Sequence, residues 1–128
     1  MSKVLVIDDD EMILKAIAAC LTGTGLTILT TTDGPQGIEM YAAEKPDVVI
    51  LDLVLPNADG LDVLKQILKN DPDAKIIICS GYGSQEAIDV AMGYGAFAFL
   101  NKPFDMESVV QLTVSALRSK NGARSVAK

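Results

Sequence analysis

The chain has 128 residues, 49% of them hydrophobic, which is typical of one globular domain with its own core. Seventeen Asp and Glu residues against eleven Lys and Arg residues give a net charge of -6, which argues against nucleic acid or an anionic membrane as the main partner. The last eleven residues hold four basic residues and no acidic one, so the negative charge belongs to the rest of the chain.

Targeting segments and disulfides are not expected. The apolar run near the start is only four residues long, too short for an export signal, and no segment approaches the roughly 18 apolar residues of a membrane span. Cys20 and Cys79 lie in separate apolar segments without metal-binding spacing, so we expect reduced, inert thiols. These features predict a cytoplasmic protein.

Five short apolar runs alternate with helix-length segments along the chain. The runs, which we expect to be β-strands, are 3–7, 26–30, 47–51, 75–79 and 96–100. After Asp10, an apolar stripe indicates an amphipathic helix, formed by Ile13, Ile17, Cys20 and Leu21. A second stripe is formed by Leu61, Leu64, Ile67 and Leu68, and a third, in a helix over 106–119, by Val109, Leu112, Val114 and Leu117.

Capping residues support these helix boundaries. Asp33 with Gln36 has the spacing of a capping box, and Ser84 and Asp105 are suitable N-caps. Near the end of the fourth predicted helix, Gly93 or Gly95 is expected to adopt a positive φ.

The alternation predicts an α/β fold, a doubly wound five-stranded parallel sheet with helices on both faces and the flavodoxin-like strand order 2-1-3-4-5. Residues 1–120 form the predicted domain, and 121–128 are a flexible tail or the start of a linker. In such folds, ligands bind beyond the carboxyl ends of the strands.

Acidic residues follow the first and third predicted strands. Asp8, Asp9 and Asp10 come after the first, and Asp52 stands at the exposed end of the third, before a loop that begins LVLP. If these strands are neighbours, about 4.8 Å apart, Asp8 or Asp9 lies beside Asp52 and their repulsion requires a cation. Mg²⁺ prefers such oxygen ligands, and Mn²⁺ is also compatible. The chain has no His, which disfavours zinc.

Four motifs resemble those of the receiver domain of two-component response regulators, the chemotaxis-regulator fold. They are VIDDDE, ILDLVLPNADG, ICSGYG and FLNKPFD, in that order at successive strand ends, and the resemblance covers residues 3 to about 118. It implies that Asp52 is the phosphoacceptor and that Asp8, Asp9 and Asp52 hold Mg²⁺ together with the backbone carbonyl of Val54.

The resemblance also implies a phosphoryl site and a switch. Ser80 would hydrogen-bond the phosphoryl group and Lys102 would neutralise it, with a cis bond expected between Lys102 and Pro103. Ser80 and Phe99 match the family's switch pair, which acts on a surface made of the fourth helix, the fifth strand and the fifth helix. The family often has Tyr in place of Phe99, so a partner cannot receive a hydroxyl hydrogen bond from this ring.

The implied function is that of a phosphorelay module and not of an enzyme acting on a separate substrate. Its partners would be a sensor histidine kinase or phosphotransfer protein and a downstream output domain or protein, with the chain a monomer or weak dimer. Two alternatives stay open: a domain of a hybrid histidine kinase or transcriptional regulator, and a pseudo-receiver that only binds a partner.

Three other classes fit the sequence poorly. The pattern G-x-G-x-x-A at 93–98 precedes a strand instead of opening a helix after one, which disfavours a dinucleotide site. An aspartyl-phosphate phosphatase needs a second acid two residues after its nucleophile, where this chain has Val54. A flavodoxin-type carrier needs hydroxyls after the first strand, where three aspartates would repel a cofactor phosphate.

Overall fold

Five parallel strands form one sheet in the computed structural model, which describes residues 2–55, 58–81 and 85–119. They are β1 (Lys3–Ile7), β2 (Thr27–Thr31), β3 (Val48–Asp52), β6 (Ile76–Ser80) and β7 (Ala98–Asn101). Their spatial order is β2-β1-β3-β6-β7. Counted within this sheet, the order is 2-1-3-4-5, which confirms the predicted topology.

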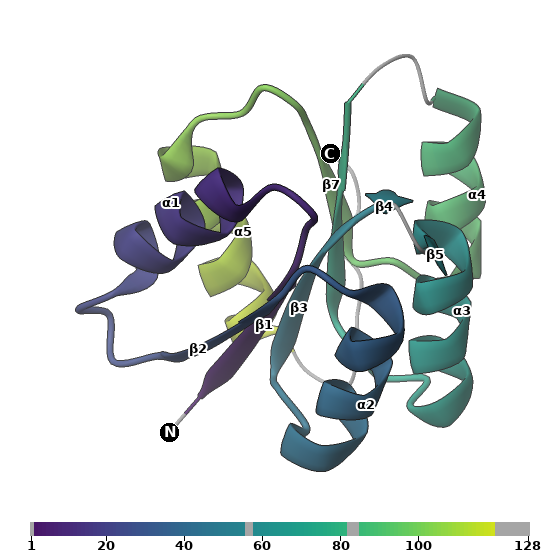
Figure 1. The fold of residues 1–128 in the computed structure, drawn as a ribbon, viewed down its shortest axis with the longest axis horizontal. Coiled ribbons are helices and arrows are strands. Elements are labelled where there is room, and N and C mark those ends of the chain that lie inside the picture. The colour runs from purple at the N-terminus through teal and green to yellow at the C-terminus, as the bar shows by residue number, and fades with distance from the viewer. Residues whose placement is uncertain (1, 56–57, 82–84, 120–128) are drawn as a thin grey trace.

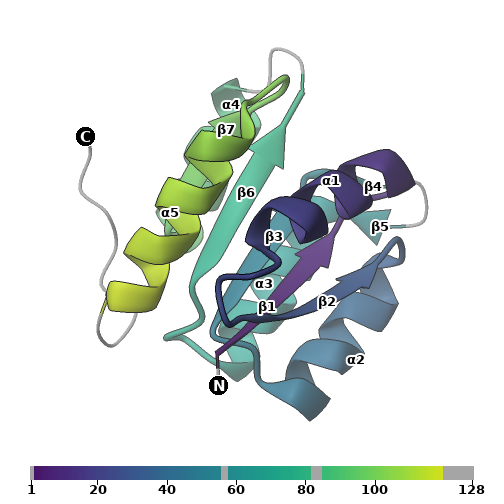
Figure 2. The same ribbon diagram turned by 90° about the vertical axis from the view of Figure 1, so that its left-hand side faces the viewer.

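Helices cover both faces of this sheet (Figures 1 and 2). On one face lie α1 (Glu11–Leu21) and α5 (Met106–Arg118), which contact each other. On the other lie α2 (Gly34–Glu44), α3 (Gly60–Asn70) and α4 (Gln85–Tyr94). Since parallel strands must be joined by crossovers, this two-sided arrangement follows from the βα alternation. None of the helices in the described ranges is long and apolar enough to cross a membrane.

The core consists of two apolar layers, one on each face of the sheet. Alternate residues of β1 supply both: Val4 and Val6 pack toward α1 and α5, whereas Leu5 and Ile7 pack toward α2, α3 and α4. All four side chains are fully buried. Strands buried on both faces lack the polar alternation of a half-exposed strand, which explains the continuous apolar runs in the sequence.

The carboxyl ends of the strands differ from the predicted ones. The second to fifth strands of the sheet each extend one residue further, and they end at Thr31, Asp52, Ser80 and Asn101. The stretch LVLP, predicted to be a loop, contains the short strand β4 (Val54–Leu55), which pairs antiparallel with β5 (Ala58–Asp59). Two-residue strands are too short to produce a periodic pattern, so the sequence carried no signal for this pair of strands.

The structure confirms some of the predicted helix caps and contradicts one. Asp105 caps α5 by accepting a 2.7 Å hydrogen bond from the Ser108 amide, as expected. Asp33 is the N-cap of α2, but it forms no side-chain capping bond, and Gln36 Oε1 accepts a hydrogen bond from Thr31 Oγ1. The capping-box prediction was therefore wrong. Gly95 has φ 122°, as expected for a helix exit, and Ser84 lies outside the described residues.

The buried helix faces are rotated slightly from the predicted stripes. In α1 the buried residues are Leu14, Ile17 and Leu21, whereas Ile13 and Cys20 are half-buried. The buried faces of the other two helices are Val63, Leu64 and Ile67 with Gly60 in α3, and Val109, Thr113 and Ala116 in α5. Several stripes fit a short helix almost equally well, and packing against the sheet selects one of them.

Candidate functional site

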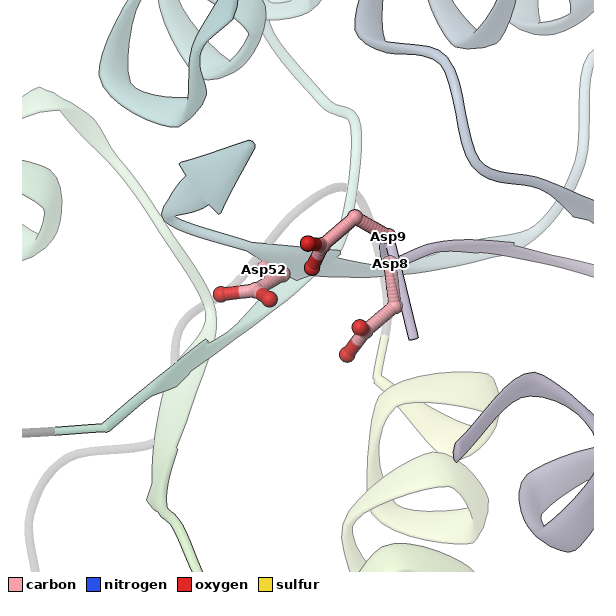
Figure 3. Close-up of side chains that lie close together, drawn as sticks. All are labelled: Asp8, Asp9 and Asp52. Atoms are coloured by element: carbon pink, nitrogen blue, oxygen red, sulfur yellow. The ribbon is translucent and has the colours of Figure 1, made fainter. Parts of the chain in front are cut away.

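Three aspartates gather at the carboxyl ends of β1 and β3 (Figure 3). One carboxylate oxygen from each of Asp8, Asp9 and Asp52 lies within 4.8 Å of the others. Asp8 and Asp52, which are 44 positions apart in the sequence, thus belong to one cluster. The reason is the pairing of β1 with β3, in which Ile7 is opposite Leu51 and the residues that follow emerge side by side.

Two of these aspartates are buried within the edge of the sheet. Asp8 is 2% exposed and Asp52 is 4% exposed, whereas Asp9 is exposed. The prediction that Asp52 stands at an exposed strand end was therefore wrong. Asp52 still belongs to β3, where it pairs with Cys79 of β6. Because an uncompensated buried carboxylate is unfavourable, the site requires positive charge.

Lys102 supplies that charge from the loop after β7. Its Nζ donates hydrogen bonds to Asp8 Oδ2 at 2.9 Å and to Asp52 Oδ2 at 3.0 Å. Burial acts to lower the pKa of Lys102, but these two carboxylates outweigh it and hold the pKa above its usual value. One ammonium group is thus shared by two buried carboxylates.

Burial also raises the pKa of Asp8, despite hydrogen bonds from the Asp10 amide and from Lys102. The charge of the neighbouring Asp52 acts in the same direction. The single ammonium therefore does not fully offset the cost of placing two carboxylates here. The three carboxylates outnumber the one ammonium group, which favours the binding of a further cation.

Backbone amides fix how both buried carboxylates are oriented. The Asp10 amide donates to Asp8 Oδ1 at 2.9 Å, and the Val54 amide donates to Asp52 Oδ1 at 3.0 Å. Each carboxylate therefore has one oxygen held by the backbone and one held by Lys102. The Asp8 amide in turn donates to the Thr31 carbonyl at 3.2 Å, which ties the loop after β1 to β2.

The cluster fits a hard divalent cation. Its donors are carboxylate oxygens only, two of them from buried residues with fixed orientation and one from an exposed residue on the solvent side. Mg²⁺ and Mn²⁺ bind such oxygen donors, commonly through one or two carboxylates with water in the remaining positions. The residues present are thus suited to hold the metal ion that the sequence predicted.

The other predicted site residues lie around the same edge. Ser80 is the last residue of β6, opposite Asn101 of β7, and its side chain lies outside what the structure describes. Phe99 is on β7 at the edge of the sheet and is 38% exposed. The Lys102–Pro103 peptide bond is cis. Lys102 thus contacts two of the three clustered aspartates, Asp8 and Asp52, whereas Phe99 lies on the outermost strand of the sheet.

An apolar pocket beside Lys102 was not anticipated from the sequence. It has a volume of about 400 Å³, and its lining residues include Ile13, Gly81, Lys102, Pro103, Phe104 and Met106. The pocket lies between the first turn of α1 and the segment that connects β7 to α5. Since its lining comes from segments far apart in the chain, only the assembled sheet brings them together.

Cys79 of β6 is paired with Asp52 of β3 and so lies beside the acidic cluster. Burial raises the pKa of this thiol to about 12, so it stays protonated and unreactive near neutral pH. Burial also raises the pKa of Cys20, and both cysteines are free. These properties agree with the expectation of inert thiols, although Cys20 is only half-buried.

Comparison with known protein families gives a match over most of the chain. Residues 4–113 match the model of the response regulator receiver domain. The chemotaxis protein CheY of Thermotoga maritima is 36% identical over 110 residues, which cover 85% of this chain and 92% of that protein. The DNA-binding transcriptional regulator NtrC of Escherichia coli is 38% identical over 114 residues, which cover 89% of this chain but only 24% of NtrC.

Solved structures show the same fold. A response regulator receiver domain protein from Clostridium thermocellum superposes with a TM-score of 0.86 and 33% sequence identity. The match covers 91% of this chain and 94% of that protein. The sequence and structural matches thus agree on both the fold and the type of domain.

Proposed function

The chain belongs to the response regulator receiver domain family, and from this we propose that it accepts a phosphoryl group on Asp52 from a phosphohistidine. The donor is a sensor histidine kinase or a phosphotransfer protein. One observation carries the proposal: Asp52 is buried at the end of β3, beside two more carboxylates and within 3.0 Å of Lys102 Nζ.

Asp52 is the nucleophile in this reaction. One of its carboxylate oxygens forms a bond to phosphorus while the bond between phosphorus and the donor histidine nitrogen breaks, and the histidine leaves with the electron pair. In the unphosphorylated protein Lys102 pairs with Asp52. After the transfer, Lys102 also pairs with the oxygens of the phosphoryl group. Hydrolysis of the acyl phosphate by water regenerates the carboxylate, so the only chemistry is the domain's own phosphorylation and dephosphorylation.

Asp8, Asp9 and Asp52 with the Val54 carbonyl are the residues that would hold Mg²⁺. When bound, the ion supplies positive charge that offsets the negative charge on the transferring oxygens. The backbone bonds to Asp8 and Asp52 keep these carboxylates oriented before it binds, which lowers the cost of assembling the site.

The output of phosphorylation is a changed surface formed by α4, β7 and α5. We assign the switch to Ser80 and Phe99: the hydroxyl moves to the phosphoryl group, and the ring turns inward from its partly exposed position at the sheet edge. Phe99 has no hydroxyl, so ring burial is the whole signal. The surface then binds a downstream protein or an output domain of a longer chain, as the similarity to both CheY and NtrC allows.

Phosphorylation can be tested with purified protein, Mg²⁺ and a small phosphodonor such as acetyl phosphate. We expect intact mass spectrometry to show one added phosphoryl group that is labile in base, and Asp52→Asn to show none. Glu39→Gln, which removes an exposed carboxylate on α2, should be phosphorylated like the unmodified protein. An unchanged mass in the unmodified protein, or phosphate retained in Asp52→Asn, would contradict the assignment.

Metal binding gives a second, separate prediction. Asp9→Ala removes the exposed member of the cluster and should weaken Mg²⁺ binding by more than about tenfold, measured by calorimetry. Its effect on folding should be small, because Asp9 is exposed. Glu39→Gln again serves as the control. Equal Mg²⁺ affinity in Asp9→Ala and the control would place the metal elsewhere.

A further inference from the structure

Gly60, the first residue of α3, makes an unusually close contact with the backbone that follows Asp52. A methyl group built on Gly60 would lie 2.4 Å from the Cα atom, 2.5 Å from the carbonyl oxygen and 2.6 Å from the carbonyl carbon of Leu53. All three are backbone atoms. A side chain can rotate away from such a clash, but here the whole strand exit would have to move.

Hydrogen bonds hold this contact from both sides. The Gly60 amide donates to the Leu53 carbonyl at 3.1 Å, and the Leu53 amide donates to the Cys79 carbonyl at 3.1 Å. Leu53 is therefore fixed between the start of α3 and the end of β6. It is also the residue that joins Asp52 to Val54, so its position sets where both of its neighbours lie.

This segment carries two of the predicted metal ligands. The Asp52 carboxylate is one, and its orientation depends on the 3.0 Å hydrogen bond from the Val54 amide. The Val54 carbonyl is the other, and β4 begins at that residue. A shift of Leu53 away from α3 would displace the Val54 carbonyl and amide together, while Asp8 and Asp9, which follow β1, stayed in place.

We propose that Gly60 is a positioning residue for the metal and phosphorylation site: lacking a side chain, it allows the Leu53 backbone to seat against α3, which sets the distance between residues 52–54 and the aspartates after β1. The proposal rests on the function proposed above, since it concerns the same site. Gly60 itself touches neither the metal ion nor the phosphoryl group.

Linkage gives the proposal a consequence in the unmodified protein. If the contact between Gly60 and Leu53 orders the ligands, metal binding must stabilise that contact in return, because coupling between two sites is reciprocal. Mg²⁺ should then slow hydrogen exchange of the Gly60 amide more than exchange of amides in the middle of α3, such as that of Ile67. This measurement does not depend on whether any variant folds.

The variant that tests the proposal is Gly60→Ala, with two matched controls. Gly93→Ala adds the same methyl group to a helical glycine of α4, where nothing lies within 4 Å of it. Leu64→Ala removes a fully buried side chain from α3 and destabilises the fold without adding any atom against the Leu53 backbone. Mg²⁺ affinity is measured by calorimetry at a temperature where each protein is folded.

We expect Gly60→Ala to weaken Mg²⁺ binding by about tenfold or more, the scale seen when groups that orient metal ligands are lost. Both controls should bind Mg²⁺ within about twofold of the unmodified protein, and the Gly60 amide should exchange more slowly with Mg²⁺. If Gly60→Ala matches Leu64→Ala in affinity, or if Mg²⁺ leaves exchange at Gly60 unchanged, the positioning role is wrong. Failure of the unmodified protein to bind Mg²⁺, by contrast, would overturn the proposed function and this inference with it.

Discussion

The two ends of the sheet both contain ion pairs with an N–O distance of 2.9 Å, but in very different surroundings. At the carboxyl end, Lys102 pairs with Asp8, whose side chain is 3% exposed. At the amino end, Lys3 pairs with Glu44, and their side chains are 36% and 44% exposed. Burial, not distance, distinguishes the two pairs, because water screens the exposed pair more strongly than the pair that contains the buried Asp8.

The charge balance also differs between the two ends. The exposed pair at the amino end joins one cation to one acid. At the carboxyl end a single ammonium serves two buried carboxylates, with the exposed Asp9 close by. A fold selected only for stability has no reason to bury this excess of negative charge. The comparison thus separates a balanced, solvated ion pair from a cluster suited to bind a cation.

The largest expected effect comes from removing the shared cation. Lys102→Met leaves Asp8 and Asp52 buried without an opposite charge, and we expect it to lower the free energy of unfolding by about 3 kcal/mol in the absence of divalent metal. Urea unfolding monitored by circular dichroism measures this loss. Mg²⁺ should restore more stability to Lys102→Met than it adds to the unmodified protein.

Lys15→Met is the matched control for this change. Lys15 is exposed on α1, so its replacement should alter the free energy of unfolding by less than about 0.5 kcal/mol. Equal effects of the two substitutions would show that Lys102 does not compensate the buried carboxylates.

A medium effect is expected at the amino end, where Tyr41 of α2 donates a 2.7 Å hydrogen bond to Asp71 after α3. Tyr41→Phe should cost about 1.5 kcal/mol near neutral pH, the lower range for a bond to a charged group. Burial, followed by the hydrogen bond to Asp71 and then the charge of Asp71, raises the pKa of Tyr41 above its ordinary value of 10.0. The folded state therefore holds this proton more tightly than the unfolded state.

The sign of the pH dependence follows from that shift. The contribution of Tyr41 is fully present below pH 10.0 and is lost as the pH rises toward the raised pKa of the folded state. The difference in stability between the unmodified protein and Tyr41→Phe should hence shrink in alkaline solution. Urea unfolding at several pH values tests this, and a difference that grows with pH would contradict it.

The smallest effect is expected for the exposed pair at the amino end. Glu44→Gln should change the free energy of unfolding by less than about 0.5 kcal/mol, because the pair is solvated and Lys3 keeps its contact with the Glu44 carbonyl. Added salt should reduce even this difference. A loss comparable to that of Lys102→Met would mean that burial is not what distinguishes the two ends of the sheet.

Much of the candidate site was predictable from the sequence, because a parallel sheet places the residues that follow its strands at one edge. Once five apolar runs alternate with helices, the residues after neighbouring strands must meet at one edge, so Asp8 and Asp52 were predicted to lie together. The role of Lys102 in neutralising the phosphoryl group was predicted from the resemblance of FLNKPFD to the family's motif. The burial of Asp52 was missed, because a single carboxylate after an apolar run looks the same whether it ends the strand or follows it.

Gly60 shows a different limit. Its motif was visible in the sequence as part of ILDLVLPNADG, but a glycine before a helix is most simply interpreted as a turn residue. Its close approach to the Leu53 backbone depends on how α3 packs beside the end of β3. No local pattern encodes that distance.

The sequence by itself determined the order of strands and helices, the two-sided sheet and the chemistry available at its carboxyl edge, because these follow from apolar patterning and from which residues come after each strand. Tertiary structure alone decided which face of each helix is buried, that Asp8 and Asp52 share Lys102, and that Leu53 lies against Gly60. Those features are distances between segments far apart in the chain, and packing sets them to within an ångström.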